Sequence, residues 1–277
     1  MKQLLRRILN LADGTSIALL LAALGAVLIL QGWKSRIPNF DMVTAIDAAQ
    51  QVIDHGRLPD RGVVTSFGSF TPPGLTWLML PGMALFRDPR LFEYVGSLAL
   101  YVGTLLGIFL VARRYFGRRC ALVAVVLYGF SGLGLMVGSS LFHRYTIQCF
   151  FVWVVYWVAR WVDENNPRWL AAAILTWAVG LNVFMEMAPA ILVIPAVWLL
   201  YRPSIRIVPL LVAAALAAAV WYPYFQFERS RHFIDLRSQI LRESIHPLDF
   251  NRSWCDPSVA PASWLTAVTL IGPSLCC

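Results

Sequence analysis

The sequence predicts an all-α protein, a polytopic transmembrane helical bundle of about seven to eight spans with juxtamembrane interfacial helices. Of its 277 residues, 58% are hydrophobic and only 14% are charged, and the mean hydropathy is +0.65. A soluble domain of this size does not need so much apolar surface. Several uncharged apolar runs approach the ~20 residues that a spanning helix requires. They are residues 17–31, 94–112, 121–142 and 207–224.

Basic residues predict the orientation of the chain. Lys2, Arg6 and Arg7 precede the first apolar run, so the positive-inside rule places the N-terminus in the cytoplasm. No small-residue cleavage site follows that run, and further runs come after it, which favours an uncleaved helix over a signal peptide. The net charge of +8 is spread over short loops between apolar runs. It therefore indicates membrane topology and no nucleic-acid partner.

Residues 71–86 are apolar enough to insert, but their topology is ambiguous. If they span the membrane, the later arginine-rich loops all lie outside, against the positive-inside rule. A helix over residues 74–86 is roughly 20 Å long, which is short of the ~30 Å hydrocarbon core. Pro72 and Pro73 supply a helix start and Pro81 supplies a kink. We therefore predict a re-entrant or interfacial helix on the outer face.

The remaining spans follow from this choice. They are residues 17–33, 94–112, 120–138, 145–162, 169–185, 187–201 and 207–224. The chain then divides into a seven-span module (1–224), an external loop with a basic interfacial helix (225–262) and the start of a further span (263–277). Because this last apolar run ends with the chain, a truncated product or a fragment is expected.

The first external loop, residues 34–93, opens with an amphipathic segment. Apolar residues recur at helical spacing over 42–55, which predicts a short helix in the interface plane. Asp41 occupies its N-cap position and Gly56 the position after its end. Asp41 is either a cap or a base at the membrane surface, and the two roles are compatible. The small and aromatic residues at 63–70 either line a sugar or lipid groove or form a plain connector.

Charged candidates also lie in the second and third external loops. His143 and Arg144 follow the third span, where they either contact a donor phosphate or anchor the end of a helix. Glu186 lies in an apolar turn. An ionisable group at a membrane edge usually faces a cavity or a partner, so Glu186 is a further candidate for the site.

The fourth external loop contains a second amphipathic segment, residues 225–244. Its basic residues are arginines and one histidine, and arginine binds phosphate in a bidentate way. Arg231 and Arg237 are therefore candidates for binding a donor phosphate, and the alternative is a solvated helix. The five cysteines have no metal-ligand spacing, so no metal site is predicted.

The order of these features resembles a known family. One span is followed by a loop with an early acidic residue, an amphipathic helix, the turn His-Gly-Arg-Leu-Pro-Asp and a Pro-Pro-Gly-Leu segment. An arginine-rich loop then separates two further spans, at residues 112–119. Over residues 1–256 this order is similar to the polytopic GT-C glycosyltransferases. In particular, it resembles the bacterial branch related to protein O-mannosyltransferases and to the aminoarabinose transferases of lipid A.

The resemblance implies a membrane glycosyltransferase that moves a sugar, with inversion, from a polyprenyl-phosphate donor to an acceptor hydroxyl at the outer face. By position, Asp41 would be the general base, although Met42 stands where many relatives have a second acid. The implied partners are the lipid-linked donor, membrane lipids and an acceptor glycan, lipid or protein in a bacterial plasma membrane. No cofactor is implied with certainty, and a divalent cation stays open.

The alternative is a non-enzymatic membrane protein, either a transporter or flippase of lipid-linked sugars or an inactive truncated homologue. A transporter places charges or helix breaks at mid-span depth. The predicted spans are almost free of ionisable residues, which favours chemistry at the outer surface.

Overall fold

The computed structural model describes residues 21–23, 25–26, 28–29, 40–64, 69–86, 89–235 and 237. Within these residues the regular secondary structure is helical, apart from an isolated antiparallel bridge between Val64 and Phe70. The all-α prediction is therefore confirmed. Most of the first predicted span and all of residues 238–277 lie outside the described residues, and the number of membrane spans stays a prediction.

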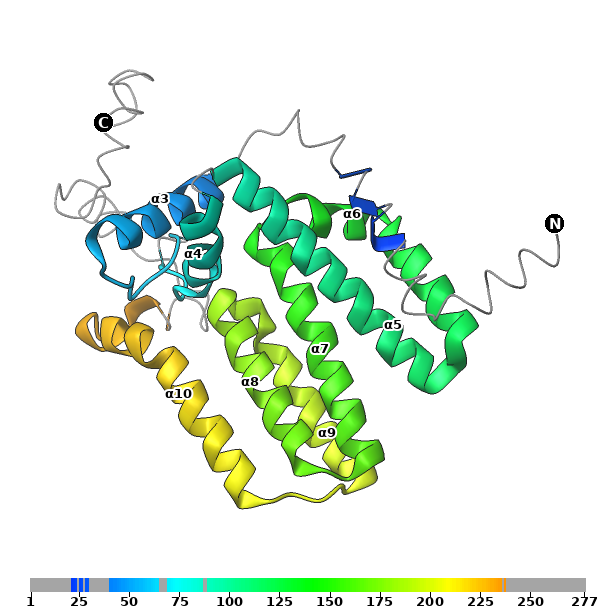
Figure 1. Ribbon diagram of the computed structural model, residues 1–277. Coiled ribbons are helices and arrows are strands. Elements are labelled where there is room, and N and C mark those ends of the chain that lie inside the picture. Colours follow the sequence, from blue (N-terminus) through cyan, green and yellow to red (C-terminus); the bar gives the residue numbers. More distant parts are fainter. Residues whose placement is uncertain are drawn as a thin grey trace.

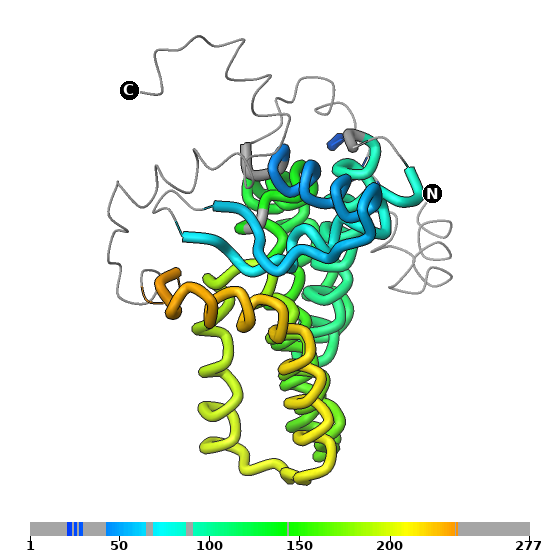
Figure 2. Tube along the Cα trace, turned by 90° about the vertical axis from the view of Figure 1, so that its left-hand side faces the viewer, coloured from blue at the N-terminus to red at the C-terminus, as the bar shows by residue number. Residues whose placement is uncertain are grey.

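The described helices form a bundle with a cap of two helices at one end. In Figure 1, α5, α7, α8 and α10 run alongside one another, and α3 and α4 lie across one end; Figure 2 shows the same arrangement from the side. Leu91–Gly129 and Ile207–Ser230 are long and apolar enough to cross a membrane. The elements are α3 (Phe40–His55), α4 (Gly74–Phe86), α5 (Pro89–Gly129), α6 (Gly132–Ser139), α7 (His143–Glu164), α8 (Pro167–Val183), η1 (Met185–Leu192), α9 (Val193–Tyr201) and α10 (Ile207–Ser230).

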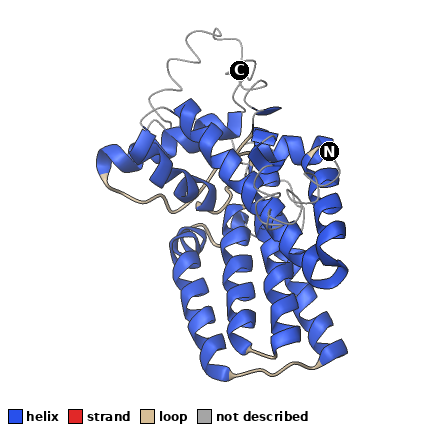
Figure 3. Ribbon diagram, turned by 45° about the vertical axis from the view of Figure 1, so that its right-hand side comes forward, coloured by secondary structure: helices blue, strands red, loops and turns tan. Residues whose placement is uncertain are grey.

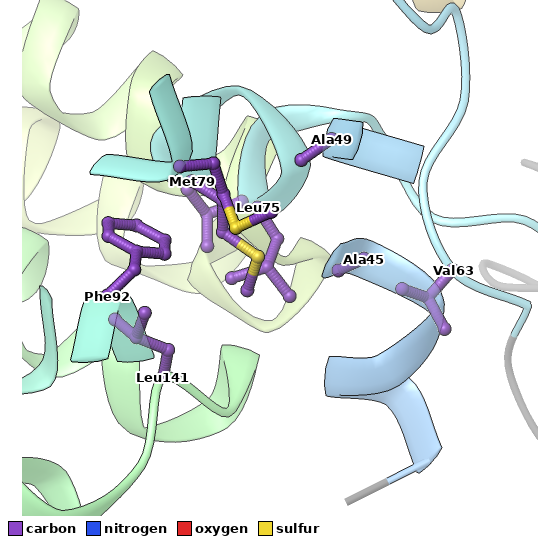
Figure 4. Close-up of a cluster of buried hydrophobic side chains, with 9 residues drawn as sticks. Ala45, Ala49, Val63, Leu75, Met79, Phe92 and Leu141 are labelled. Atoms are coloured by element: carbon purple, nitrogen blue, oxygen red, sulfur yellow. The ribbon is translucent and has the colours of Figure 1, made fainter. Parts of the chain in front are cut away.

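The amphipathic helix α3 buries the face that its periodicity predicts. Ala45 and Ala49 are fully buried in a cluster formed with α4 and its neighbours, and Figure 4 shows this cluster. Gly56 ends the helix with a φ of 68°, as predicted for a glycine after a helix. The helix already begins at Phe40, so Asp41 lies within its first turn and not at the predicted N-cap.

The helix α4 has the predicted bounds, and two glycines let it approach its neighbours closely. A Cβ atom on Gly82 would lie 1.7 Å from the ring of Phe92 on α5. A Cβ atom on Gly74 would lie 2.5 Å from the backbone carbonyl carbon of Asn182 on α8. With 13 residues, α4 is too short to cross the ~30 Å hydrocarbon core.

The long helix α5 consists of two segments that fold back on each other at Gly117. This residue has a φ of 80° and a ψ of 173°, a conformation that glycine adopts readily. Tyr101 and Leu105 of the first segment pack in one cluster with Ala121 and Val125 of the second.

The helix predicted over 120–138 is interrupted in the structure. It stops at Gly129, and α6 begins at Gly132 with the Ser131 hydroxyl accepting a hydrogen bond from the Gly134 N–H. The Tyr101 hydroxyl donates to the Gly129 carbonyl at 2.7 Å. This bond satisfies one of the acceptors that the end of a helix leaves without an intrahelical partner.

Two further elements differ from the prediction. The segment expected as one helix over 187–201 begins as the 3-10 helix η1 and becomes α-helical only at Val193. Pro189 lies inside η1, where it has no N–H to extend an α-helical ladder. The helix α10 continues to Ser230, so the external loop expected from Phe225 begins later, and Glu228 belongs to the last turns of α10.

The opposite end of the bundle is closed by short connections, which are visible in Figure 3. Arg114 of α5 pairs with Asp163 at the end of α7. The Trp161 indole N–H donates to the Ser204 carbonyl at 2.9 Å, and the Ser204 N–H donates to Asn165 Oδ1 at 2.6 Å. The loops that the positive-inside rule assigns to one side therefore meet at one end. Which side of the membrane this end faces stays a prediction.

Replacing Gly74 by alanine is expected to lower the stability of the protein, because the new methyl group would collide with the backbone of Asn182. Overpacking of this kind costs roughly 1–3 kcal/mol, which is measurable as a lower Tm of the detergent-solubilised protein. Gly132→Ala is the matched control, since nothing lies within 4 Å of a Cβ atom there. An unchanged Tm for Gly74→Ala would contradict the close approach of α4 to α8.

Candidate functional site

The loop between α3 and α4 folds back on itself and forms what we call the first-loop hairpin, residues 61–64 and 69–73. The Gly62 N–H donates to the Thr71 carbonyl at 2.6 Å, and the Thr71 N–H donates to the Val63 carbonyl at 2.9 Å. The Thr71 hydroxyl also donates to the Val63 carbonyl, at 3.0 Å. These bonds and the bridge between Val64 and Phe70 join the two sides of the loop into one compact unit.

The first-loop hairpin contacts the last turns of α10. The Tyr224 hydroxyl donates to the Phe70 carbonyl at 3.0 Å. The rings of Phe70 and Phe227 meet edge to face, with centroids 5.5 Å apart and an interplanar angle of 86°. This geometry is favourable for two aromatic rings, and both Tyr224 and Phe227 are buried. The contact therefore fixes the hairpin on the end of α10.

Two guanidinium groups lie over the same pair of aromatic rings. The Arg61 Cζ atom is 4.9 Å from the Phe70 centroid and 5.2 Å from the Phe227 centroid. The Arg231 Cζ atom is 5.2 Å and 5.5 Å from the same centroids. All four distances fall within the ~6 Å at which a ring attracts a cation. Arg61 comes from the hairpin and Arg231 follows α10. Each arginine therefore contacts one ring of its own segment and one ring of the other segment.

Two buried carboxyl groups complete this contact. Asp235 is 0% exposed and Glu228 is 2% exposed. Arg231 Nη1 donates to Asp235 Oδ2 at 2.6 Å, and Asp235 is hydrogen-bonded to the Glu228 side chain and to the Phe70 backbone. Burial and the adjacent Glu228 carboxyl outweigh the attraction of Arg231 and raise the pKa of Asp235 to about 7. Two hydrogen-bonded carboxyl groups need a proton between them, and Asp235 carries a proton under mildly acidic conditions.

A second charged pair lies at the same end of the bundle. Arg144 Nε is 3.2 Å from Glu186 Oε1, and the two side chains are 60% and 51% exposed. The Arg144 guanidinium also lies 6.0 Å from the ring centroid of Phe184. An exposed ion pair contributes only ~0–1 kcal/mol. Arg144 can therefore exchange Glu186 for another anion at low cost.

A cavity of about 440 Å³ lies between α5, α7 and η1. Its lining is mainly apolar and includes Phe151 and Met187, and Glu186 borders it. The Tyr128 hydroxyl donates to Gln148 Oε1 in its wall. Apolar walls with few polar groups fit an apolar chain better than a sugar.

The structure locates the other predicted site residues to different degrees. Arg231 contacts the first-loop hairpin, and Arg237 is exposed beyond α10. Asp41 and His143 lie in the first turns of α3 and α7, but their side chains lie outside the described part of the structure. The roles of all four residues in binding or catalysis stay predictions. Among the described residues, no three His, Cys, Asp or Glu side chains gather in a way that would hold a metal ion.

The carboxyl pair was not predicted as a distinct unit from the sequence, where both residues counted as charges of an interfacial helix. The available signal was spacing: Glu228, Arg231 and Asp235 follow one another at intervals of three and four residues. Such spacing predicts one shared helix face, but α10 ends at Ser230 and the turn after it has positive φ at His232 and Phe233. The turn and the contact of Asp235 with Phe70 therefore have no signal in the spacing.

Comparison with known proteins agrees with the described helical bundle. The family model for dolichyl-phosphate-mannose-protein mannosyltransferases matches residues 71–227. This stretch runs from the first-loop hairpin to Phe227 on α10 and includes more than half of the chain. No curated protein and no solved structure matches the chain. The extent of the family match shows that the chain belongs to the dolichyl-phosphate-mannose-protein mannosyltransferase family, whose members are membrane glycosyltransferases of the GT-C type.

Proposed function

We propose that this protein transfers a sugar, with inversion, from a polyprenyl-phosphate donor to an acceptor hydroxyl at the outer membrane face, with Asp41 as general base. The supporting observation is the contact between the first-loop hairpin and the arginine-bearing end of α10. The helix that carries Asp41 packs on α4 at this same end of the bundle. A potential base and potential phosphate ligands therefore come from elements that meet at one end.

A carboxylate suits the attack of the acceptor hydroxyl, and guanidinium groups suit the departure of the lipid phosphate. The Asp41 carboxylate takes the proton of the acceptor hydroxyl as that oxygen attacks the anomeric carbon. The bond between the anomeric carbon and the phosphate oxygen breaks, and its electron pair remains on the lipid phosphate. Attack from the side opposite the leaving group inverts the configuration. Guanidinium groups beside the phosphate stabilise the negative charge that develops there.

Exposure separates the arginine candidates for this phosphate. Arg144 and Arg237 are exposed, and the ion pair of Arg144 is weak because water surrounds it. Arg231 is only 27% exposed and is paired with Asp235 at 2.6 Å. We therefore assign phosphate binding to Arg144 and Arg237, with His143 adjacent in sequence, and assign Arg231 to holding the first-loop hairpin.

The proposal includes an orientation in a bacterial plasma membrane. The end with α3 and α4 faces outward, and the N-terminus, the Gly117 turn and the connections at Asn165 and Ser204 face the cytoplasm, as the positive-inside rule requires for about seven spans. The family description names dolichyl-phosphate mannose. A polyprenyl-phosphate mannose is therefore the first donor to assay, with hydroxyl groups of glycans, lipids and proteins as acceptors.

Asp41→Asn is expected to lower the rate of sugar transfer by ~10²–10⁴-fold, because an amide cannot accept the acceptor proton. The measurement is transfer of radiolabelled sugar from polyprenyl-phosphate donors by protein in proteoliposomes. Asp54→Asn on the exposed side of the same helix is the control and is expected to retain activity. Wild-type rates for Asp41→Asn would remove Asp41 as the base.

Cysteine labelling tests the orientation. Leu85→Cys and Phe116→Cys are made in a background without the five native cysteines, at side chains that are 77% and 72% exposed. A membrane-impermeant maleimide is expected to label position 85 in intact cells, and position 116 only after permeabilisation. The reverse pattern, or labelling of both positions in intact cells, would contradict a re-entrant α4.

A further inference from the structure

The proposed reaction does not use the buried carboxyl pair of Glu228 and Asp235. With 2% and 0% exposure, these groups have no access to a substrate in the described arrangement. Two adjacent carboxyl groups removed from water are strongly destabilising when both are ionised. Their position at the contact between α10 and the first-loop hairpin indicates a role in that contact.

We propose that the Glu228–Asp235 pair is a proton-dependent latch, which holds the first-loop hairpin on the end of α10 while the pair carries a proton and weakens this contact when both groups ionise.

The contacts of Asp235 show how a proton can control the hairpin. Asp235 is hydrogen-bonded to the Phe70 backbone on one side and to the Glu228 side chain on the other. The same Phe70 residue receives the Tyr224 hydrogen bond and packs on Phe227. Loss of the shared proton replaces the bond between the carboxyl groups by repulsion between two anions. That repulsion acts directly beside the residue through which the hairpin is attached.

The charged and titratable groups around Asp235 come from three segments. The end of α10 contributes Glu228 and the Tyr224 phenol, the following turn contributes Arg231, and the hairpin contributes Arg61 over the Phe70 ring. Arg231 favours ionisation of Asp235, but burial is the largest influence and opposes it. As a result, the Asp235 carboxyl stays protonated at pH values well above those at which an aspartate usually ionises.

The direction of the pH effect follows from this balance. The pKa of Asp235 is about 7 in the docked arrangement, whereas a solvated aspartate has a pKa of about 3.9. Docking is therefore strongest below pH ~4, weakens as the pH rises, and changes no further above pH ~7. Between these limits the ratio of docked to undocked protein falls by up to about tenfold for each pH unit.

Spin labels at positions 60 and 229 can report docking without reference to activity. Asp60 precedes the first-loop hairpin, Arg229 lies in the last turn of α10, and both are exposed. Their separation is measured by pulsed electron paramagnetic resonance in the full-length, cysteine-free protein in nanodiscs, from about pH 5 to about pH 8. We expect one short distance at the lowest pH and a growing population of longer distances as the pH rises.

One variant removes the titrating group, a second removes only the repulsion, and a third is the control. Asp235→Asn keeps a side chain that can bond to both Glu228 and the Phe70 N–H, so the short distance is expected at every pH. Glu228→Gln leaves Asp235 able to ionise but removes the second anion that repels it, so the short distance is expected to persist to higher pH than in the wild type, and this variant serves as the test if Asp235→Asn does not fold. Asp54→Asn is expected to respond to pH like the wild type. The latch is overturned if the wild-type distances do not change with pH or if Asp235→Asn opens like the wild type.

The consequence for catalysis rests on the proposed function. Because the first-loop hairpin connects to both α3 and α4, sugar transfer is expected to fall over the same pH range in the wild type and less in Asp235→Asn. If the spin-label distances change with pH as expected but the protein transfers no sugar, the proposed function is rejected and the latch is retained. Unchanged distances would reject the latch whatever the activity.

Discussion

The contact between Phe70 and the end of α10 determines how the first-loop hairpin, α3 and α4 are arranged at one end of the bundle. The hydrogen bond from Tyr224 to Phe70 joins residues that are 154 positions apart, so it closes a loop that contains most of the bundle. The first-loop hairpin leads to α3 on one side and to α4 on the other. Because Gly74 and Gly82 seat α4 on α8 and α5, the position of Phe70 is fixed against two parts of the bundle at once.

The interruptions of the helices lie near the cavity. Tyr128 precedes the end of α5, and Pro189 lies in η1, and both line the cavity between α5, α7 and η1. Irregular backbone in a membrane protein is tolerated where it is buried in protein or borders a cavity. Side chains of other helical segments bond to backbone carbonyls at these interruptions: the Trp177 indole N–H donates to the Met187 carbonyl at 3.1 Å, and the Tyr101 hydroxyl donates to the Gly129 carbonyl at 2.7 Å. The cavity is thus bounded by side chains on elements whose ends are held by specific bonds.

Local features of the fold were predictable because their causes are local. The proline pair and the length of the apolar run gave the bounds of α4, and the apolar period gave the buried face of α3 at Ala45 and Ala49. The break near Ser131 has no signal in hydropathy, since it lies within a continuous apolar run. It depends on a cap and on the hydrogen bond from Tyr101, a residue of a different helical segment. Tertiary contacts of this kind override local pattern.

The sequence predicted which charged residues belong to the candidate site, but it did not predict which of them form pairs. The sequence identified Arg144, Glu186 and Arg231 as separate charged candidates, and their spacing contains no information about which of them pair. The pairing of Arg144 with Glu186 arises because α7 and η1 begin at the same end of the bundle. Asp235 is buried where it contacts Phe70, a residue from a distant part of the sequence.

In the proposed orientation Arg144 and Arg231 lie on the outer face, where the positive-inside rule disfavours arginine, so each needs a local cause. Arg231 has the buried Asp235 as its partner, and its guanidinium also lies over the rings of Phe70 and Phe227, which attract the cation in either protonation state of Asp235. Arg144 has a solvated partner, whose loss costs at most about 1 kcal/mol. Under the proposed function, the singly charged phosphodiester of the donor therefore displaces Glu186 from Arg144 more readily than Asp235 from Arg231. The difference in burial alone separates an arginine suited to binding a substrate from one suited to holding the loop beside it.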